Sequence, residues 1–112
     1  MLVERKEHKE PNGEIGYIES VFDSGNVLKT TYFPINNKLY IAFNRGNTYS
    51  YLNVIPQKYQ EFENAESQGK FFRENFLNKK EYPCVKEFSL YPNEIKDLKE
   101  VVDIHKNKNI DE

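Results

Sequence analysis

The chain has 112 residues, of which 38% are hydrophobic and 30% charged, and its formal net charge is −2. This length predicts one domain with a small core, and the charge excludes a global positive field, so that binding of nucleic acid would require a local patch. One cysteine and two histidines cannot make an internal disulfide or a metal site of recognised spacing, and no apolar run has transmembrane length.

Residues 1–14 are rich in alternating charges and are predicted to form either a solvated arm or an edge hairpin. The hairpin alternative depends on the turn Pro11-Asn12-Gly13, because Asn-Gly tolerates the positive φ that a tight turn needs. These first residues lack the apolar run of a signal peptide, so we expect a cytoplasmic protein with no membrane contact.

Residues 15–106 are predicted to form a single α+β domain that begins with a small antiparallel meander of three or more strands. β-prone side chains after Ile15 favour a first short strand. Three further strands, joined by short turns, are predicted at Val27–Phe33, Lys38–Phe43 and Thr48–Val54. In the last of these, alternation places Tyr49, Tyr51 and Asn53 on one face.

Two short helices are predicted to follow, the first starting at Pro56 and the second capped by Ser67. Residues 82–91 form a possible extra strand. Residues 93–106 give the clearest helix signal, with an apolar stripe of Ile95, Leu98, Val101, Val102 and His105. This stripe either packs on its own domain or mediates homo-oligomerisation. Residues 107–112 are predicted to be a frayed tail.

Residues 24–82 carry an ordered series of aromatic, glycine and proline positions. The series consists of Tyr32, Pro34, Leu39, Ile41, Phe43, Gly46, Tyr49, Tyr51, Val54, Pro56, Tyr59, Ala65-Glu66-Ser67, Gly69, Phe71-Phe72 and Tyr82. In this order and spacing it resembles the KTSC domain, which is found at the C-terminus of some bacterial lysyl-tRNA synthetases and in small stand-alone proteins.

The resemblance implies no established activity, although RNA binding has been suggested for such domains from the synthetase context. Two departures are visible, Ile55-Pro56 where the family has a proline pair and Asn78-Lys79-Lys80 where it has an arginine-rich stretch. The second departure weakens the suggestion of RNA binding, because the planar guanidinium of arginine can bind a phosphate in a bidentate way and the lysine ammonium cannot. Residues 1–23 and 83–112 lie outside the resemblance.

Two groups of residues are candidate ligand sites. Tyr49 and Tyr51 could stack bases with help from Tyr32, or they could be core rings with hydroxyls at the rim. The stretch Ser67 to Arg73 could bind a phosphate or carboxylate at a helix N-terminus, with Gly69 allowing close approach, or it could be an ordinary cap with solvated cations. The cations that would take part are Lys70, Arg73, Lys79 and Lys80, with Arg45 as an outlying partner.

No nucleophile and base can be paired, so we expect no enzyme, no cofactor and no metal. Neither His8 nor His105 has a catalytic partner near it in sequence, and Cys84 is predicted to be buried or half-buried. The first functional hypothesis is therefore a non-enzymatic module that binds RNA or a nucleotide-like anion. In a phage or mobile element, such a module could sequester a nucleotide signal. The alternative is a protein–protein or homo-oligomeric assembly module without a small ligand.

Overall fold

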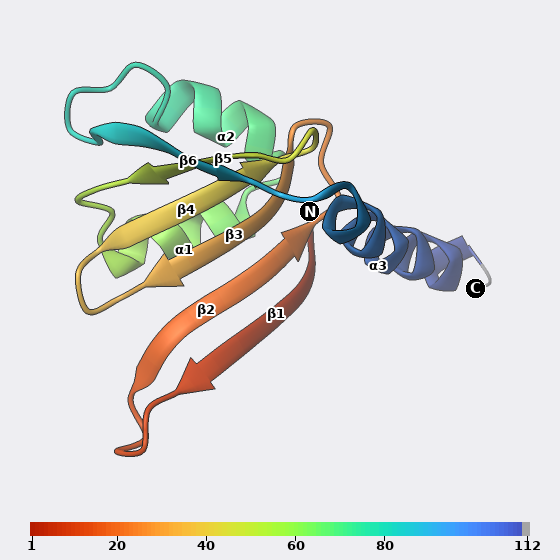
Figure 1. The fold of residues 1–112 in the computed structure, drawn as a ribbon, viewed down its shortest axis with the longest axis horizontal. Helices are drawn as coiled ribbons and strands as arrows, with labels where there is room; N and C mark the ends of the chain where they lie inside the picture. Colours follow the sequence, from red (N-terminus) through yellow and green to blue (C-terminus); the bar gives the residue numbers. More distant parts are fainter. Residues whose placement is uncertain (111–112) are drawn as a thin grey trace.

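A computed structural model describes residues 1–110 of the chain, and the side chains of residues 1–108 (Figure 1). The elements in chain order are β1 (Leu2–Lys9), β2 (Ile15–Phe22), β3 (Val27–Phe33), β4 (Lys38–Phe43), β5 (Asn47–Tyr51), α1 (Pro56–Asn64), α2 (Gln68–Asn75), β6 (Cys84–Ser89) and α3 (Pro92–Ile110). The six strands form one antiparallel sheet in strict chain order, β1 to β6. The predicted α+β fold, a meander followed by two short helices and a C-terminal helix, is confirmed.

The core lies between the sheet and the helices α1 and α2, which cover one face of the sheet (Figure 1). We call this the inner face. Alternation within the strands sends large apolar side chains to it, and Leu39 and Ile41 are fully buried there. Aromatic rings from both helices close the core: Phe62 of α1 meets Phe22 edge to face, with ring centroids 5.5 Å apart, and Phe72 of α2 meets Tyr51 in the same way at 5.7 Å.

The N-terminal segment is the edge hairpin rather than the solvated arm. Strand β1 pairs with β2 along its length, from Leu2 opposite Phe22 to Lys9 opposite Ile15. The turn between them contains Gly13 with a φ of +89°, as the Asn-Gly signal predicts. This hairpin extends beyond α1 at the bottom of Figure 1, so part of its inner face is not covered by a helix.

Strand β5 ends three residues earlier than predicted, because Asn53 adopts a left-handed φ of +65°. The Asn53 side chain then donates to the carbonyl of Glu81 at 3.2 Å, and the chain turns toward α1. Asn53 therefore does not continue the face of Tyr49 and Tyr51. The possible extra strand exists as β6, which pairs with β5.

Helix α3 packs against β1, β2 and β3 through the predicted stripe. Ile95, Leu98, Val101, Val102 and His105 are its buried or half-buried residues, and its other side chains from Pro92 to Lys108 are exposed. Its start fits closely on the β4–β5 turn, where a Cβ at Gly46 would lie 2.7 Å from Ile95 Cδ1. The helix continues to Ile110, so residues 107–110 of the predicted tail are helical, and residues 111–112 lie outside the described part.

Candidate functional site

The tyrosines predicted as stacking candidates are placed in or beside the core. Tyr51 is 4% exposed and packs on Phe72, and Tyr32 is 1% exposed and stacks on Tyr59 with ring centroids 4.4 Å apart. The Tyr32 hydroxyl donates to the carbonyl of Val54 at 2.6 Å, and burial raises the pKa of this hydroxyl to about 12. Buried rings of this kind have no face free for a base.

Tyr49 is intermediate between core and surface. It is half-buried on the inner face of β5, and its ring meets Phe43 edge to face with centroids 6.1 Å apart. The shared face of Tyr49 and Tyr51 is therefore the one that α2 covers, and both rings serve packing first.

The start of α2 is capped by Ser67, whose hydroxyl accepts the Lys70 N–H at 3.2 Å. The first turn lies against the β2–β3 turn, since a Cβ at Gly69 would be 3.2 Å from Asn26 Cβ. The same Cβ would be 3.5 Å from Arg73 Nη1, so the guanidinium of Arg73 folds back over the helix start. Lys70 and Arg73 therefore flank one turn of helix.

The other predicted cations divide between the two ends of α2. Arg45 lies near the start of the helix, because the backbone carbonyl of Asn26 accepts the Asn44 N–H at 2.9 Å. Lys79 and Lys80 follow the end of the helix, about 12 Å away along its axis. We call this set the cationic surface: Arg45, Lys70, Arg73, Lys79 and Lys80.

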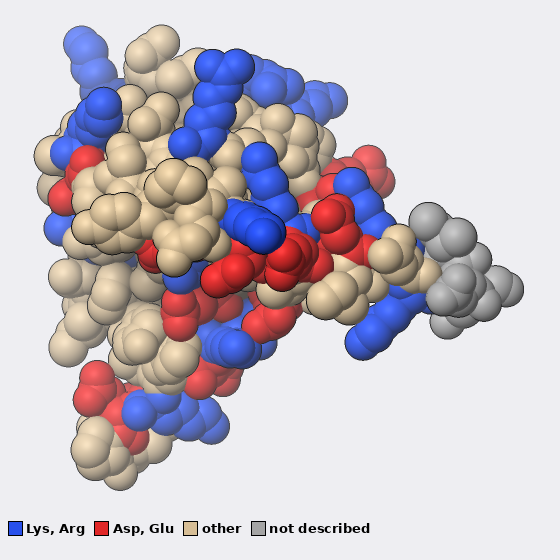
Figure 2. Space-filling model, turned by 45° about the vertical axis from the view of Figure 1, so that its right-hand side comes forward, with Lys and Arg blue, Asp and Glu red and all other residues tan. Residues whose placement is uncertain are grey.

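All five side chains of the cationic surface are exposed, and within the described chain none of them forms an ion pair. Some lysines elsewhere are paired, Lys29 with Glu19 at 2.7 Å and Lys106 with Asp23 at 3.4 Å, whereas Lys96 and Lys99 on α3 are exposed and also form no ion pair with a described residue. Figure 2 shows mainly basic side chains at the upper end of the molecule, the end that carries α2, whereas basic and acidic side chains are interspersed lower down.

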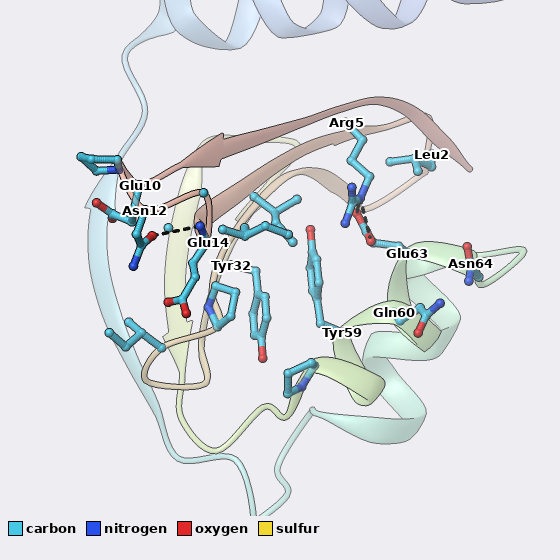
Figure 3. Close-up of a pocket in the computed structure, with 18 residues that line it drawn as sticks. Leu2, Arg5, Glu10, Asn12, Glu14, Tyr32, Tyr59, Gln60, Glu63 and Asn64 are labelled. Atoms are coloured by element: carbon cyan, nitrogen blue, oxygen red, sulfur yellow. Dashed lines mark hydrogen bonds and ion pairs between the residues drawn. The ribbon is translucent and has the colours of Figure 1, made fainter.

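Sequence reasoning missed a second feature, a cleft between the β1–β2 hairpin and α1 (Figure 3). Its volume is about 1260 Å³. Three parts of the chain form its walls: the hairpin from Leu2 to Ile18, the β3–β4 turn with Pro34 and Ile35, and the face of α1 that turns toward the hairpin, from Pro56 to Asn64. We call this space the hairpin cleft.

The floor of the hairpin cleft is made of the stacked rings of Tyr32 and Tyr59 together with Ile15 and Ile18. A buried polar network lies behind the Tyr59 ring. The Tyr59 hydroxyl donates to Ser20 Oγ at 3.0 Å and shares a hydrogen bond with Thr30 Oγ1 at 2.9 Å. Ser20 in turn donates to the carboxylate of Glu63 at 2.7 Å.

The two ends of the hairpin cleft carry different charges (Figure 3). At one end Arg5 Nε donates to Glu63 at 3.0 Å, so this pair is neutral as a whole. At the other end, near the hairpin turn, Glu10 and Glu14 form no ion pair with any residue that the structure describes. The Glu10 carboxylate lies against Gly16, where a Cβ would be 2.6 Å from its Oε1.

The sequence held one signal of this cleft, the Pro11-Asn12-Gly13 turn that predicts the hairpin. What it lacked was any sign that α1 does not reach the hairpin tip.

The structure also corrects the prediction for Cys84, which is exposed on β6 rather than buried or half-buried. Among residues 1–110, no group of three or more His, Cys, Asp or Glu side chains could hold a metal ion, and no helix there is long and apolar enough to span a membrane.

Comparison with known proteins supports the resemblance seen in the sequence. Residues 23–82 match the family model of the KTSC domain. The chain is also similar to a KTSC domain protein from Yersinia pestis of known crystal structure, with a TM-score of 0.55 and 33% sequence identity. This similarity covers 62% of the present chain and 96% of the other. No curated protein matches the chain. Strands β1, β2 and β6 and helix α3 lie outside the range that matches the family model.

Proposed function

This chain belongs to the KTSC domain family, and from that premise and the placement of its unpaired cations we propose that it is a non-enzymatic module that binds RNA or a nucleotide-like anion through the cationic surface. The observation that carries the proposal is the position of these five exposed cations at the two ends of α2. In a protein with a net charge of −2, none of them forms an ion pair with a residue that the structure describes. Phosphate groups would supply the counter-charge.

The geometry favours contacts to the sugar–phosphate backbone over contacts to bases. Tyr32 and Tyr51 are buried, so the stacking platform that sequence-tolerant single-strand binders use is absent from the inner face. Three of the five cations are lysines, which act as point charges rather than as bidentate forks. Binding is therefore expected to depend little on base sequence and strongly on salt.

Charge reversal of the helix start tests the proposal. Lys70→Glu with Arg73→Glu is expected to abolish binding of a fluorescein-labelled single-stranded RNA, measured by anisotropy across a potassium chloride series. Replacing only one of the two cations should lower the slope of log K against log salt by about 0.7, the value for one lost phosphate contact on a single strand. Unlabelled nucleotides in the same assay show whether a free nucleotide competes.

The matched control is Lys96→Glu with Lys99→Glu, which makes the same change in net charge on the exposed side of α3. It should weaken RNA binding only slightly. Equal losses in both double variants would mean that net charge, not this surface, sets the affinity. Undiminished RNA binding by Lys70→Glu with Arg73→Glu would remove the helix start from the site.

Assembly through α3, the alternative raised by the sequence, has less support. The apolar stripe that would form the interface is buried on the chain's own sheet, with Val102 only 8% exposed. Of the side chains that the structure describes on the opposite side of α3, Ile104 is the one large apolar residue, and it is 56% exposed. The cationic surface is therefore the better basis for a function.

A further inference from the structure

The hairpin cleft has an unbalanced charge. Four charged side chains line it: Arg5, Glu10, Glu14 and Glu63. Arg5 and Glu63 neutralise one another, and Arg5 also donates to Glu7. Glu10 and Glu14 remain, so the end of the cleft near the hairpin turn carries two negative charges without a partner among the described residues. A cation that entered there would meet no competing positive charge.

The cleft is also apolar along its length. Ile15, Ile18 and the stacked tyrosine rings form its floor, and Pro34, Ile35 and Pro56 form one side. Ile35 is 90% exposed, which is unusual for a large apolar side chain. Nothing in the core requires Ile35 in this position, because it lies in the β3–β4 turn and contacts water on almost all sides.

Side-chain amides are distributed around the opening. Asn12 lies at the hairpin turn, and Gln60 and Asn64 lie on the facing side of α1 (Figure 3). Each amide offers both donors and an acceptor, which matches the alternating N–H and C=O groups of an extended main chain. An apolar floor, polar groups at the rim and acidic residues at one end together resemble the requirements of a peptide-binding groove.

We propose that the hairpin cleft binds an extended peptide segment that carries apolar side chains and lysine or arginine. The apolar side chains would lie against Ile15 and Ile35, above the buried rings of Tyr32 and Tyr59, and a cationic side chain would reach Glu10 and Glu14. The volume of about 1260 Å³ exceeds the range of about 300–1,000 Å³ typical of small-molecule sites, which favours a segment of polypeptide. RNA is disfavoured, since its phosphates would face two carboxylates.

The proposal is independent of the cationic surface. The hairpin turn, which lies outside the range matched by the family model, supplies both unpaired carboxylates. In Figure 1 the hairpin turn and α2 lie at opposite ends of the molecule. RNA and peptide would therefore occupy separate surfaces, and loss of one activity need not affect the other.

Two synthetic peptides test the proposal on the full chain. One repeats Lys-Leu-Gly and the other repeats Glu-Leu-Gly, each three times, with blocked ends and a fluorescent label. In ¹H–¹⁵N spectra the basic peptide is expected to shift the amide signals of residues 10–16 and 60–64. The acidic peptide is expected to leave these signals in place.

Two variants then assign the contacts. Glu10→Gln with Glu14→Gln should weaken binding of the basic peptide by up to about tenfold, the sum of two exposed charge contacts. Ile35→Ser should weaken it severalfold through the apolar contact, and it leaves the core untouched because Ile35 is exposed. The amide spectrum of each free variant confirms that it is folded.

The control variant is Glu100→Gln with Asp103→Asn on the exposed side of α3, which removes the same charge at a distance from the cleft. It should bind the basic peptide like the wild type. The proposal is overturned if this control loses as much affinity as the cleft variant, if the acidic peptide binds equally well, or if the shifted signals lie outside the cleft. Lys70→Glu with Arg73→Glu should retain peptide binding, so failure of the RNA proposal is recognised separately.

Discussion

At the scale of single residues, Tyr59 joins α1 to the sheet in two ways. Its ring stacks on Tyr32, and its hydroxyl lies among the buried hydroxyls of Ser20 and Thr30. Burial raises the pKa of the Tyr59 hydroxyl, although its hydrogen bonds to Ser20 and Thr30 act in the opposite direction, so the group stays protonated at neutral pH. A neutral hydroxyl can donate to Ser20, which then donates to Glu63.

Tyr59→Phe is expected to lower the free energy of unfolding by about 1–3 kcal/mol, because Ser20 and Thr30 lose a buried partner without a change in packing volume. Urea unfolding followed by circular dichroism measures the difference. Tyr82→Phe is the matched control, since Tyr82 is half-buried and its described contact is through the ring, on Phe76. Equal losses in the two variants would show that the Tyr59 network contributes nothing specific.

Sequence patterns predicted structural features that depend on a few neighbouring residues better than they predicted contacts between residues far apart in the chain. The cap at Ser67 and the positive φ in the Asn12-Gly13 turn follow from chemistry within a few residues, and both are found. Alternation also placed Tyr49 and Tyr51 on one face of a strand. It could not show that α2 covers this face, because that depends on Phe72 and Phe76, more than 20 residues away.

At the scale of elements, the hydrophobic periodicity of α3 predicted which of its residues are buried but not where the helix ends. All five residues of its predicted stripe are buried or half-buried, since an apolar stripe must find a partner surface whichever one it is. The end of the helix was predicted at residue 106, where polar residues begin. Lysine is nevertheless a good helix former and asparagine disfavours a helix only weakly, and the helix runs to Ile110. Strand β5 was predicted too long, because the positive φ of Asn53 has no strong sequence signal.

Leu98→Asp with Val102→Asp is expected to cost about 3 kcal/mol or more of stability, since each change places a carboxylate against the apolar surface of the sheet. Thermal unfolding measures the loss. Sedimentation velocity of the folded variant should match that of the wild type, because the stripe faces its own domain. Dissociation of a wild-type oligomer by this variant would instead place α3 in an interface. Lys96→Asp with Lys99→Asp, on the exposed side, should leave stability nearly unchanged.

At the scale of the whole molecule, the helix start of the cationic surface could be predicted from the sequence, whereas the hairpin cleft could not. Lys70 and Arg73 are neighbours in sequence, so a helix start was enough to bring them together. The hairpin cleft joins Glu10 to Gln60 and Asn64, and no pattern within a window of residues connects such positions. The hairpin itself was foreseen as an alternative, but its extension beyond α1 is a property of the assembled sheet and helices.

The position of β6 makes the last strand the least protected part of the sheet. It is an edge strand whose partner is β5, with Cys84 opposite Tyr51, and five of its six side chains are exposed. Backbone amides of β6 are therefore expected to exchange with solvent faster than those of β3 in native-state hydrogen exchange. Equal protection of β3 and β6 would show that the sheet opens as one unit.

Strict chain order also has a consequence for how the molecule is made. Strands β2 to β5 each pair with the strand synthesised just before, so short loops close first and the sheet can grow as the chain leaves the ribosome. Strand β6 arrives only after both helices have been completed. Until then the outer edge of β5 presents unpaired N–H and C=O groups, to which a strand of another nascent chain could add. Strand β6 thus ends the period in which the growing sheet is open to misassembly.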